Sequence, residues 1–181
     1  GKQLLEVIGY KEIGMDHFAL PSDSLYNAME TGSLHRNFMG YTASKTKAMI
    51  GLGVSAISDS WYAFAQNVKS IEEYYHLLDE NIIPVYRGHG LNDEDLIIRK
   101  HVLNLMCQFE THWNTPEKKF NELSDVIIKL KEFQNDGLLF FENEGLHVTE
   151  KGKPFIRNIC MAFDLLLQRK KPETQLFSMT V

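Results

Sequence analysis

The stretch IGLGVSAIS, from Ile50 to Ser58, decides what kind of fold the first half of the chain can have. Gly51, Gly53 and Ala56 have the spacing of the G-x-G-x-x-G/A fingerprint, with which dinucleotide-binding folds hold a pyrophosphate. The alternative is a buried strand whose glycines let another backbone or a ligand come close. The surrounding residues distinguish these two interpretations.

The context of the stretch favours the strand. Only Ala48, Met49 and Ile50 precede the first glycine, and the residues ISDS that follow Ala56 are a poor helix start. The fingerprint also needs an acidic residue about 20 positions further on, at the end of the next strand. Glu72 and Glu73 have this distance but fall inside a predicted helix. We therefore interpret residues 50–58 as a buried strand and not as a phosphate loop.

Helical and extended segments alternate in the first half of the chain. Helices are predicted over residues 2–8, 24–32 and 70–81, the last with Ser70 as N-cap and Glu73 as its capping-box partner. Residues 10–20 and 48–58 are extended and apolar, and residues 35–47 form an irregular connection with several cations. This order predicts an α/β domain with a parallel sheet. Two strands are too few for such a domain, so we expect more of it upstream and a chain cut within a helix.

The pattern changes after Pro84 to three helices, a hairpin and a closing helix. Asn92 and Asp95 predict a capping box, Thr115-Pro116 a second helix start, and residues 124–135 a third helix. LLFFENEGLHVT (138–149) reads as a hairpin, and Thr149 caps a helix that runs to about Arg169. Its inward-facing residues are Phe155, Ile156, Ile159, Phe163 and Leu166. We predict a mostly helical, winged-helix-like domain over residues 89–181, after a first domain over 1–88.

Composition indicates a globular protein and excludes several other classes. The chain has 181 residues, 44% of them hydrophobic and 24% charged, and its net charge is −5. No apolar run approaches the roughly 20 residues that span a bilayer, so we expect no membrane partner and a cytoplasmic location. The negative charge argues against nucleic acid. Cys107 and Cys160 stand 53 residues apart, without the spacing of a metal site, and are expected to be buried thiols.

Four strings carry a resemblance to a known family. GYKEIGMDHFALPSDSL (9–25), GSLHRNFMGYT (32–42), IGLGVSAISDSWYAFAQN (50–67) and GLHVTEKGKPFIRNICMAFD (145–164) together resemble the carboxy-terminal part of the oxygen-independent coproporphyrinogen III oxidases. These are radical S-adenosylmethionine (SAM) enzymes of haem biosynthesis. The resemblance implies the end of a partial (β/α) barrel followed by a smaller carboxy-terminal domain. Haem chaperones are built on the same scaffold. A haem chaperone is therefore the first alternative to an oxidase of this family.

The resemblance implies a reaction and its cofactors. The family converts two propionates of coproporphyrinogen III to vinyl groups by oxidative decarboxylation, with a deoxyadenosyl radical made from SAM at a [4Fe-4S] cluster. An electron donor and an electron acceptor, neither of which the sequence identifies, are further partners. The cluster is held by a C-x-x-x-C-x-x-C loop, which this chain lacks. We therefore expect the fragment to need the upstream barrel portion, and to be inactive and without bound cofactor or metal alone.

Three residues are candidates for binding. Ile57 matches the family position at which an isoleucine of the last barrel strand contacts SAM. Because the substrate carries four carboxylates, we expect cations and directional donors in its pocket. Arg36, between His35 and Asn37, is the first candidate for a propionate contact, and His17 is the second. Where the family commonly has glutamine this chain has Met39, so the sequence assigns that loop no role. No catalytic residue is assigned.

The remaining alternative is a DNA-binding role for the winged-helix-like part. In such a role, the helix predicted over residues 124–135 would enter a groove of the DNA. This helix has Lys129 and Lys131 but also Asp125 and Glu132. A DNA-binding helix should present a basic face. We expect this part instead to cover the barrel mouth or to shape the substrate pocket.

Overall fold

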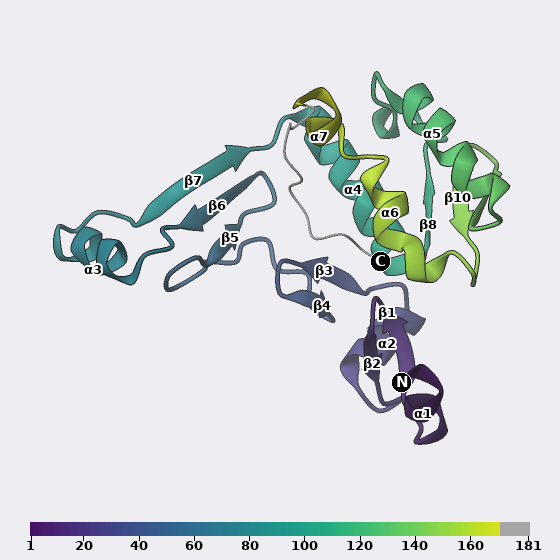
Figure 1. Ribbon diagram of the computed structural model, residues 1–181, viewed down its shortest axis with the longest axis horizontal. Coiled ribbons are helices and arrows are strands. Elements are labelled where there is room, and N and C mark those ends of the chain that lie inside the picture. The colour runs from purple at the N-terminus through teal and green to yellow at the C-terminus, as the bar shows by residue number, and fades with distance from the viewer. Residues whose placement is uncertain (171–181) are drawn as a thin grey trace. The chain divides into compact units, whose positions relative to one another are not determined.

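The computed structural model describes residues 1–170 (Figure 1). The contacts between residues divide the chain into two compact units. Unit 1 comprises Gly1–Ile13 and His17–Arg99. Unit 2 comprises Gly14–Asp16 and the residues from Lys100 on. In the described part of the chain, no helix is both long enough and apolar enough to cross a bilayer.

Unit 1 consists of short helices and strands. Its elements are α1 (Lys2–Val7), β1 (Lys11–Gly14, whose last residue belongs to unit 2), β2 (His17–Ala19), α2 (Ser24–Glu30), β3 (His35–Asn37), β4 (Gly40–Thr42), β5 (Ile57–Asp59), β6 (Ala63–Asn67), α3 (Ile71–Asp79) and β7 (Val85–Gly90). The predicted capping is present at α3, where Ser70 Oγ accepts a hydrogen bond from the Glu73 amide. The three predicted helices of this region are therefore confirmed.

The sequence predicted a parallel sheet, and this prediction is wrong. β5, β6 and β7 form a three-stranded sheet in that order, and both pairs are antiparallel. Only residues 60–62 join β5 to β6, and a connection of that length can make a hairpin but no crossover. The described residues contain four small sheets and no closed barrel.

Two further segments of unit 1 differ from the prediction. Residues 10–20 form two paired strands, β1 and β2, because Met15 and Asp16 adopt positive φ angles and turn the chain. The connection predicted as irregular contains the β3–β4 hairpin, in which Arg36 pairs with Tyr41. Both hairpins turn within two residues, a local geometry that a hydrophobicity pattern does not reveal.

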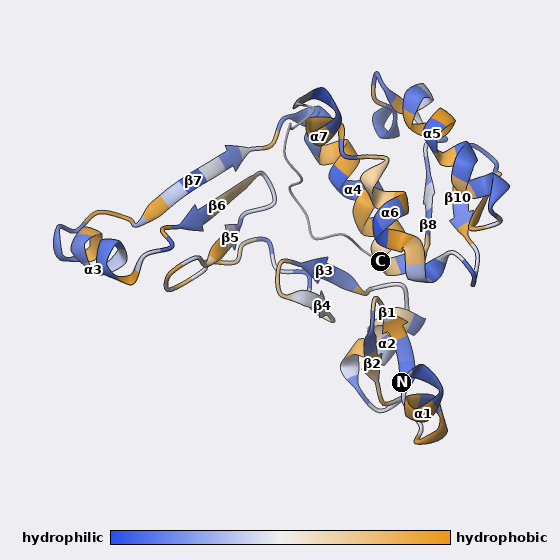
Figure 2. Cartoon of the chain, viewed as in Figure 1, coloured by the Kyte–Doolittle hydropathy of each residue, from blue (hydrophilic) through white to orange (hydrophobic). Residues whose placement is uncertain are grey.

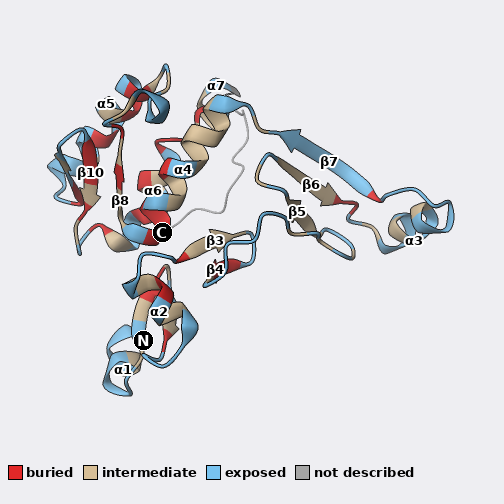
Figure 3. Cartoon of the chain, turned by 180° about the vertical axis from the view of Figure 1, so that it is seen from behind, coloured by how far each residue is buried: buried red, intermediate tan, exposed pale blue. Residues whose placement is uncertain are grey.

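The stretch at residues 50–58 is neither one strand nor buried. Regular strand begins only at Ile57, after a turn at Gly53, Val54 and Ser55. Ile50 and Leu52 are 79% and 85% exposed. The apolar run predicted burial. Instead, the loop leads into β5, the edge strand of its sheet, and no helix of unit 1 packs a core against that sheet. α3 buries none of its residues, and β7 is exposed along its whole length (Figure 3).

Unit 2 combines helices with one small sheet. After α4 (Asp93–Gln108), which begins in unit 1, come β8 (Glu110–His112), the 3-10 turn η1 (Pro116–Lys118), α5 (Leu123–Asn135), β9 (Leu139–Glu142), β10 (Gly145–Val148), η2 (Lys153–Phe155), α6 (Ile156–Met161) and α7 (Leu165–Lys170). The predicted hairpin is confirmed, since β9 and β10 pair antiparallel with Phe141 opposite Leu146. β8 pairs with the other edge of β10, which gives the order β8-β10-β9.

The core of unit 2 is formed by apolar positions of its helices and sheet. Figure 2 shows hydrophobic positions along α4 and α6, and Figure 3 shows buried positions on β8 and β10. Leu105, Leu130, Leu146 and Phe163 are fully buried. The apolar spacing of the helices predicted such a core.

The closing helix that the sequence predicted is interrupted. α6 ends at Met161, and α7 begins at Leu165. Asp164 causes the break in part, because its Oδ1 accepts a hydrogen bond from the Leu167 amide at 2.8 Å and so caps a new helix. Of the residues predicted to face inward, Ile156, Ile159 and Phe163 are buried, whereas Phe155 and Leu166 are exposed.

Candidate functional site

The three candidate residues lie on three different strands of unit 1. Ile57 begins β5 and pairs with Gln66 on β6. Arg36 is the central residue of β3, and His17 begins β2. The structure brings Arg36 and His17, which belong to two different hairpins, to the same residue, Tyr41, and places Ile57 on a third sheet, β5-β6-β7.

Side chains of the neighbouring sheet and helix fix the loop before Ile57. Asn67, which is buried, donates from Nδ2 to the carbonyls of Gly51 (3.1 Å) and Gly53 (2.9 Å). The Gly51 amide donates to Ser58 Oγ, and the Gly53 amide donates to Tyr74 Oη on α3. Both glycine amides are thus already bonded within the unit. This arrangement supports the rejection of a phosphate loop, which would turn those amides toward the ligand.

Gly51 allows the loop to lie directly over Ile57. A Cβ atom at Gly51 would stand 2.7 Å from the Ile57 carbonyl oxygen and 2.9 Å from the Ala56 Cβ, closer than such atoms approach. The sequence predicted that a glycine here admits another backbone or a ligand, and a backbone fills the position. Ile57 itself is half-buried. Its side chain can therefore offer van der Waals contact, and its position depends on Gly51.

Arg36, Tyr41 and His17 form a compact cluster. Arg36 and Tyr41 are directly opposite each other in the β3–β4 hairpin and so share a face. The guanidinium carbon lies 4.7 Å from the centre of the Tyr41 ring, within the range of a cation–π interaction. The His17 ring meets the same tyrosine edge to face at 5.1 Å. A Cβ at Gly40 would come within 3.2 Å of His17 Nε2, so the glycine leaves room for the imidazole.

Arg36 has an unsatisfied donor. Its Nη1 atom is buried and has no hydrogen-bond partner among the described residues. Buried polar atoms in native structures almost always have a partner, and an exception calls for an explanation. A guanidinium nitrogen is a strong donor to carboxylate or phosphate oxygens. An anionic ligand on this face of the hairpin would supply the missing acceptor.

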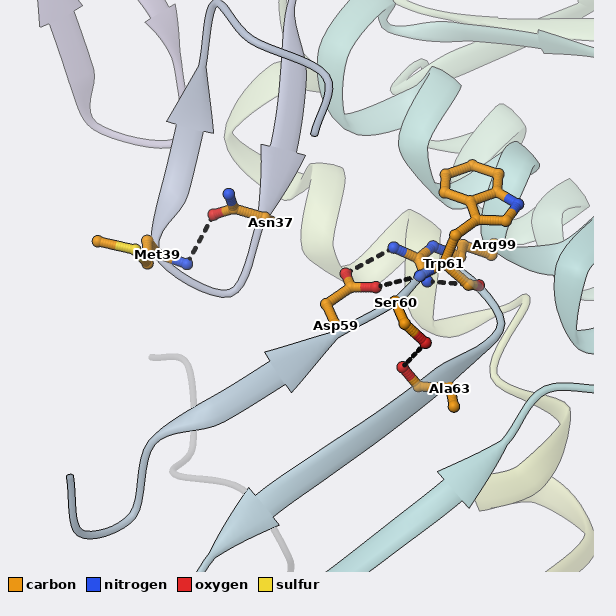
Figure 4. Close-up of polar contacts among 7 residues, drawn as sticks. All are labelled: Asn37, Met39, Asp59, Ser60, Trp61, Ala63 and Arg99. Atoms are coloured by element: carbon orange, nitrogen blue, oxygen red, sulfur yellow. Dashed lines mark hydrogen bonds and ion pairs between the residues drawn. The ribbon is translucent and has the colours of Figure 1, made fainter. Parts of the chain in front are cut away.

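An ion pair that the sequence did not reveal fixes the turn between β5 and β6 (Figure 4). Arg99 Nη2 lies 2.6 Å from Asp59 Oδ2, and Arg99 Nη1 donates to the Trp61 carbonyl at 2.9 Å. The guanidinium also stacks over the rings of Trp61 (4.4 Å) and Phe64 (4.9 Å). The Arg99 and Asp59 side chains are only 12% and 11% exposed. Because the partners are 40 residues apart in sequence, no local pattern could have identified the pair.

The turn of the β3–β4 hairpin contacts strand β6, next to this ion pair. The Phe38 ring meets Phe64 edge to face at 5.1 Å. Burial lowers the pKa of His35, and the positive charges of Lys45 and Arg99 lower it further against an opposing effect of Asp59. Side chains alternate along a strand, so His35 faces away from the side that carries Arg36. The hairpin thus presents Arg36 on one face and packs toward Asp59 and Arg99 on the other.

The turn of this hairpin exposes Met39. Asn37 Oδ1 accepts a hydrogen bond from the Met39 amide at 2.8 Å, which closes the turn (Figure 4). The Met39 side chain is 86% exposed. The turn geometry therefore depends on Asn37 and not on the residue at position 39.

The described residues do not fit a four-iron cluster. Cys107 on α4 is buried, as the sequence predicted, whereas Cys160 on α6 is only half-buried. Within residues 1–170, the potential metal-binding group of histidine, cysteine and acidic side chains contains no cysteine. Four thiolates, or three with an open iron, are needed for such a cluster.

The chain is similar to enzymes of one kind. No protein-family model matches it. It is 40% identical, over 96% of its length, to proteins named oxygen-independent coproporphyrinogen III oxidase from Synechocystis and from Escherichia coli, and 35% identical over 91% to one from Helicobacter pylori. The solved structure of the Escherichia coli coproporphyrinogen III oxidase, described as a radical SAM enzyme, matches with a TM-score of 0.84 at 38% identity over 91% of the chain. The chain spans 39% of the length of the first two relatives.

Proposed function

We propose that this chain, which is homologous to a part of the oxygen-independent coproporphyrinogen III oxidases, supplies substrate- and cofactor-facing strands of such an enzyme. The complete protein would oxidatively decarboxylate two propionates of coproporphyrinogen III to give protoporphyrinogen IX. Bound SAM and its iron–sulfur cluster would supply the radical chemistry. The cluster ligands would come from outside this chain, and we propose the cytoplasm as the location.

The observation that carries the proposal is the Arg36 cluster. Arg36 has a buried Nη1 without a partner, and its ring neighbour Tyr41 also contacts His17. Coproporphyrinogen III carries four carboxylates, each able to accept from a guanidinium. We assign Arg36 to a propionate contact and His17 to the same end of the pocket. In this role the two residues bind and orient the substrate, and they take no part in proton transfer.

Ile57 is assigned to SAM through packing. Its side chain is half-buried, and Gly51 fixes the backbone on one side of it. Next to this position, Ile50 and Leu52 offer further exposed apolar surface. An apolar wall also excludes water from a radical, which helps to prevent side reactions.

We propose that the two parts of the chain belong to different domains of the complete protein. Residues 1–88 would be the last part of the radical SAM barrel domain; because β5, β6 and β7 are antiparallel, they would lie beside the parallel barrel strands and not among them. Residues 89–181 would be a winged-helix-like carboxy-terminal domain. The order of helix α4, strand β8, helix α5 and hairpin β9–β10 supports this description.

A chimera tests the proposed function. The aligned segment of the Escherichia coli enzyme is replaced by this chain, the cluster is reconstituted without oxygen, and conversion of coproporphyrinogen III is measured with SAM and a reductant. We expect turnover to protoporphyrinogen IX. A chimera with a full cluster and bound SAM that transfers haem without any turnover would favour the haem chaperone instead.

Variants of the chimera test the residue assignments. Arg36→Met should raise KM about tenfold or more, because a charged hydrogen bond of about 1.5–3 kcal/mol is lost. Arg157→Met, at an exposed arginine of α6, is the matched control and should leave KM unchanged. Ile57→Asp should weaken SAM binding while substrate affinity stays the same. Equal effects of Arg36→Met and Arg157→Met would refute the propionate contact.

A further inference from the structure

A second group of functional side chains lies on the small sheet of unit 2. Glu110 and His112 are on β8, and His147 is on β10. His147 is directly opposite Glu110, and Gly145 is directly opposite His112. Residues two apart on a strand share a face, as do directly paired residues. Register alone therefore places the carboxylate and both imidazoles on one face of the sheet.

The donor atoms of these three residues converge. Glu110 Oε2 lies 3.0 Å from His147 Nδ1, and Glu110 Oε1 lies 4.0 Å from His112 Nε2. One donor atom from each residue can be chosen so that all lie within 4.8 Å of one another. Bonds of about 2.0–2.2 Å to zinc place tetrahedral ligands roughly 3.4 Å apart. Small side-chain rotations would suffice to reach that spacing.

The neighbouring residues fit the two imidazoles. A Cβ at Gly145 would stand 2.2 Å from His112 Nδ1, so the His112 ring lies in space that only glycine leaves free. The Phe140 ring, from the residue opposite His147 on β9, stacks on the His147 imidazole at 5.1 Å with planes 14° apart. The two imidazoles meet edge to face at 5.4 Å. Ring positions defined in this way reduce the entropy lost on binding a metal.

The exposure of the cluster permits an ion to enter. The side chains of Glu110, His112 and His147 are 43%, 35% and 26% exposed. Two imidazoles and one carboxylate are ligands typical of zinc and other divalent transition metals, and water fills the remaining positions. A surface ion pair between Glu110 and His147 alone would not need His112 on the same face, nor the space above Gly145.

We propose that Glu110, His112 and His147 form a site for a divalent transition metal of the zinc class. The bound ion would join β8 to β10 and so hold the edge strand on the hairpin. The site lies in unit 2, contains none of the residues assigned above, and does not rest on the proposed function. Because the ligands must be deprotonated to bind, the affinity for the metal falls as the pH falls.

Calorimetric titration with zinc(II) tests the site. The 181-residue chain is stripped with chelator and titrated near neutral pH, and we expect one ion per chain. His112→Gln, His147→Gln and Glu110→Gln should each weaken binding by at least about tenfold, since loss of even an outer-shell partner costs that much. His76→Gln is the matched control: His76 is another exposed histidine 3.6 Å from a glutamate, Glu80, on α3.

A second measurement does not depend on how the variants fold. Imidazole ¹H–¹⁵N correlation spectra of the unmodified chain, recorded with and without zinc, should show shifts confined to His112 and His147. Shifts of other histidines, or a stoichiometric affinity that His112→Gln and His147→Gln leave unchanged, would overturn the proposal. Binding of no zinc at all by the folded chain would do the same.

Discussion

The two units bury their apolar side chains to very different degrees. Of the buried hydrophobic residues in the described part of the chain, sixteen belong to unit 2 and six to unit 1. The large exposed hydrophobic residues are distributed the other way, with seventeen in unit 1 and five in unit 2. Ile82, Ile83, Val85 and Tyr86 follow one another closely in sequence and are all exposed, and exposed apolar surface that gathers into a patch marks an interaction site or an unstable protein. We infer that unit 2 has a core of its own, whereas unit 1 needs a further surface to cover its sheet.

The unit with the smaller core is also the one that carries the proposed binding residues. The Arg36 cluster and Ile57, to which we assign substrate and SAM, lie in the unit with the smaller core. The relatives from Synechocystis and Escherichia coli are more than twice as long as the chain, so they contain residues that could cover the exposed strands.

Removal of a core ring should destabilise unit 2 strongly. Phe163 is fully buried, and its ring stacks on His101 at 5.6 Å. Phe163→Ala should lower the free energy of unfolding by about 4 kcal/mol, because it leaves a cavity. Urea unfolding followed by the emission of buried Trp113, in a Trp61→Phe background, measures the loss. The control Phe155→Ala, at a 45% exposed ring, should cost less than about 1 kcal/mol. Equal losses would contradict a packed core around Phe163.

Loss of the Asp59 charge should loosen unit 1 and leave unit 2 unchanged. Asp59→Asn leaves the nearly buried Arg99 without its ionic partner. Breaking one side of a buried pair costs about 3 kcal/mol or more. Within the chimera, where β5 and β6 should be protected, their amide exchange should accelerate accordingly, while exchange in α6 and β10 stays as it was. Glu80→Gln, which removes an exposed pair with His76, is the control and should change little. Faster exchange throughout both units would show that they do not unfold separately.

Acidification should destabilise unit 2 through His101. Burial lowers the pKa of His101 below its ordinary value of 6.5, although the hydrogen bond to the Lys118 carbonyl opposes this shift. Below pH 6.5 the unfolded chain binds a proton that the folded chain still rejects, so the free energy of unfolding falls until the pH drops below the folded pKa. Urea unfolding at several pH values between 7.5 and 5, with chelator present, measures this slope. His101→Asn should reduce the dependence of the unfolding free energy on pH, and the control His112→Gln should leave it unchanged. If His101→Asn also leaves this dependence unchanged, other groups cause it.

Local signals in the sequence predicted a large part of this structure. Ser70 with Glu73, and Asn92 with Asp95, form their capping interactions within four residues, so the helix starts could be read directly. The β9–β10 hairpin depends on the turn at Asn143 and Glu144, both with positive φ. Such features depend on neighbours in sequence and on little else.

Features that depend on distant residues could not be predicted. β7 has the sequence VYRGHG, without alternation, and is a strand only because β6 supplies its partner. β8 pairs with β10 more than 30 residues later, and this pairing assembles the Glu110, His112 and His147 cluster. Of the candidate site, the sequence indicated Arg36 and His17 separately. Their meeting at Tyr41 depends on the pairing of β3 with β4 and on the space left by Gly40.

Hydrogen exchange by mass spectrometry, on the chain alone and within the chimera, tests most directly whether unit 1 depends on residues outside this chain. Amides of β5, β6 and β7 should exchange quickly in the isolated chain. They should exchange slowly in the chimera, where residues from outside this chain cover the sheet. Amides of α4 after Arg99, of α6 and of β10 should exchange at the same slow rate in both. Equally slow exchange of β5–β7 in the isolated chain would contradict the account, because unit 1 would then be stable without any further surface.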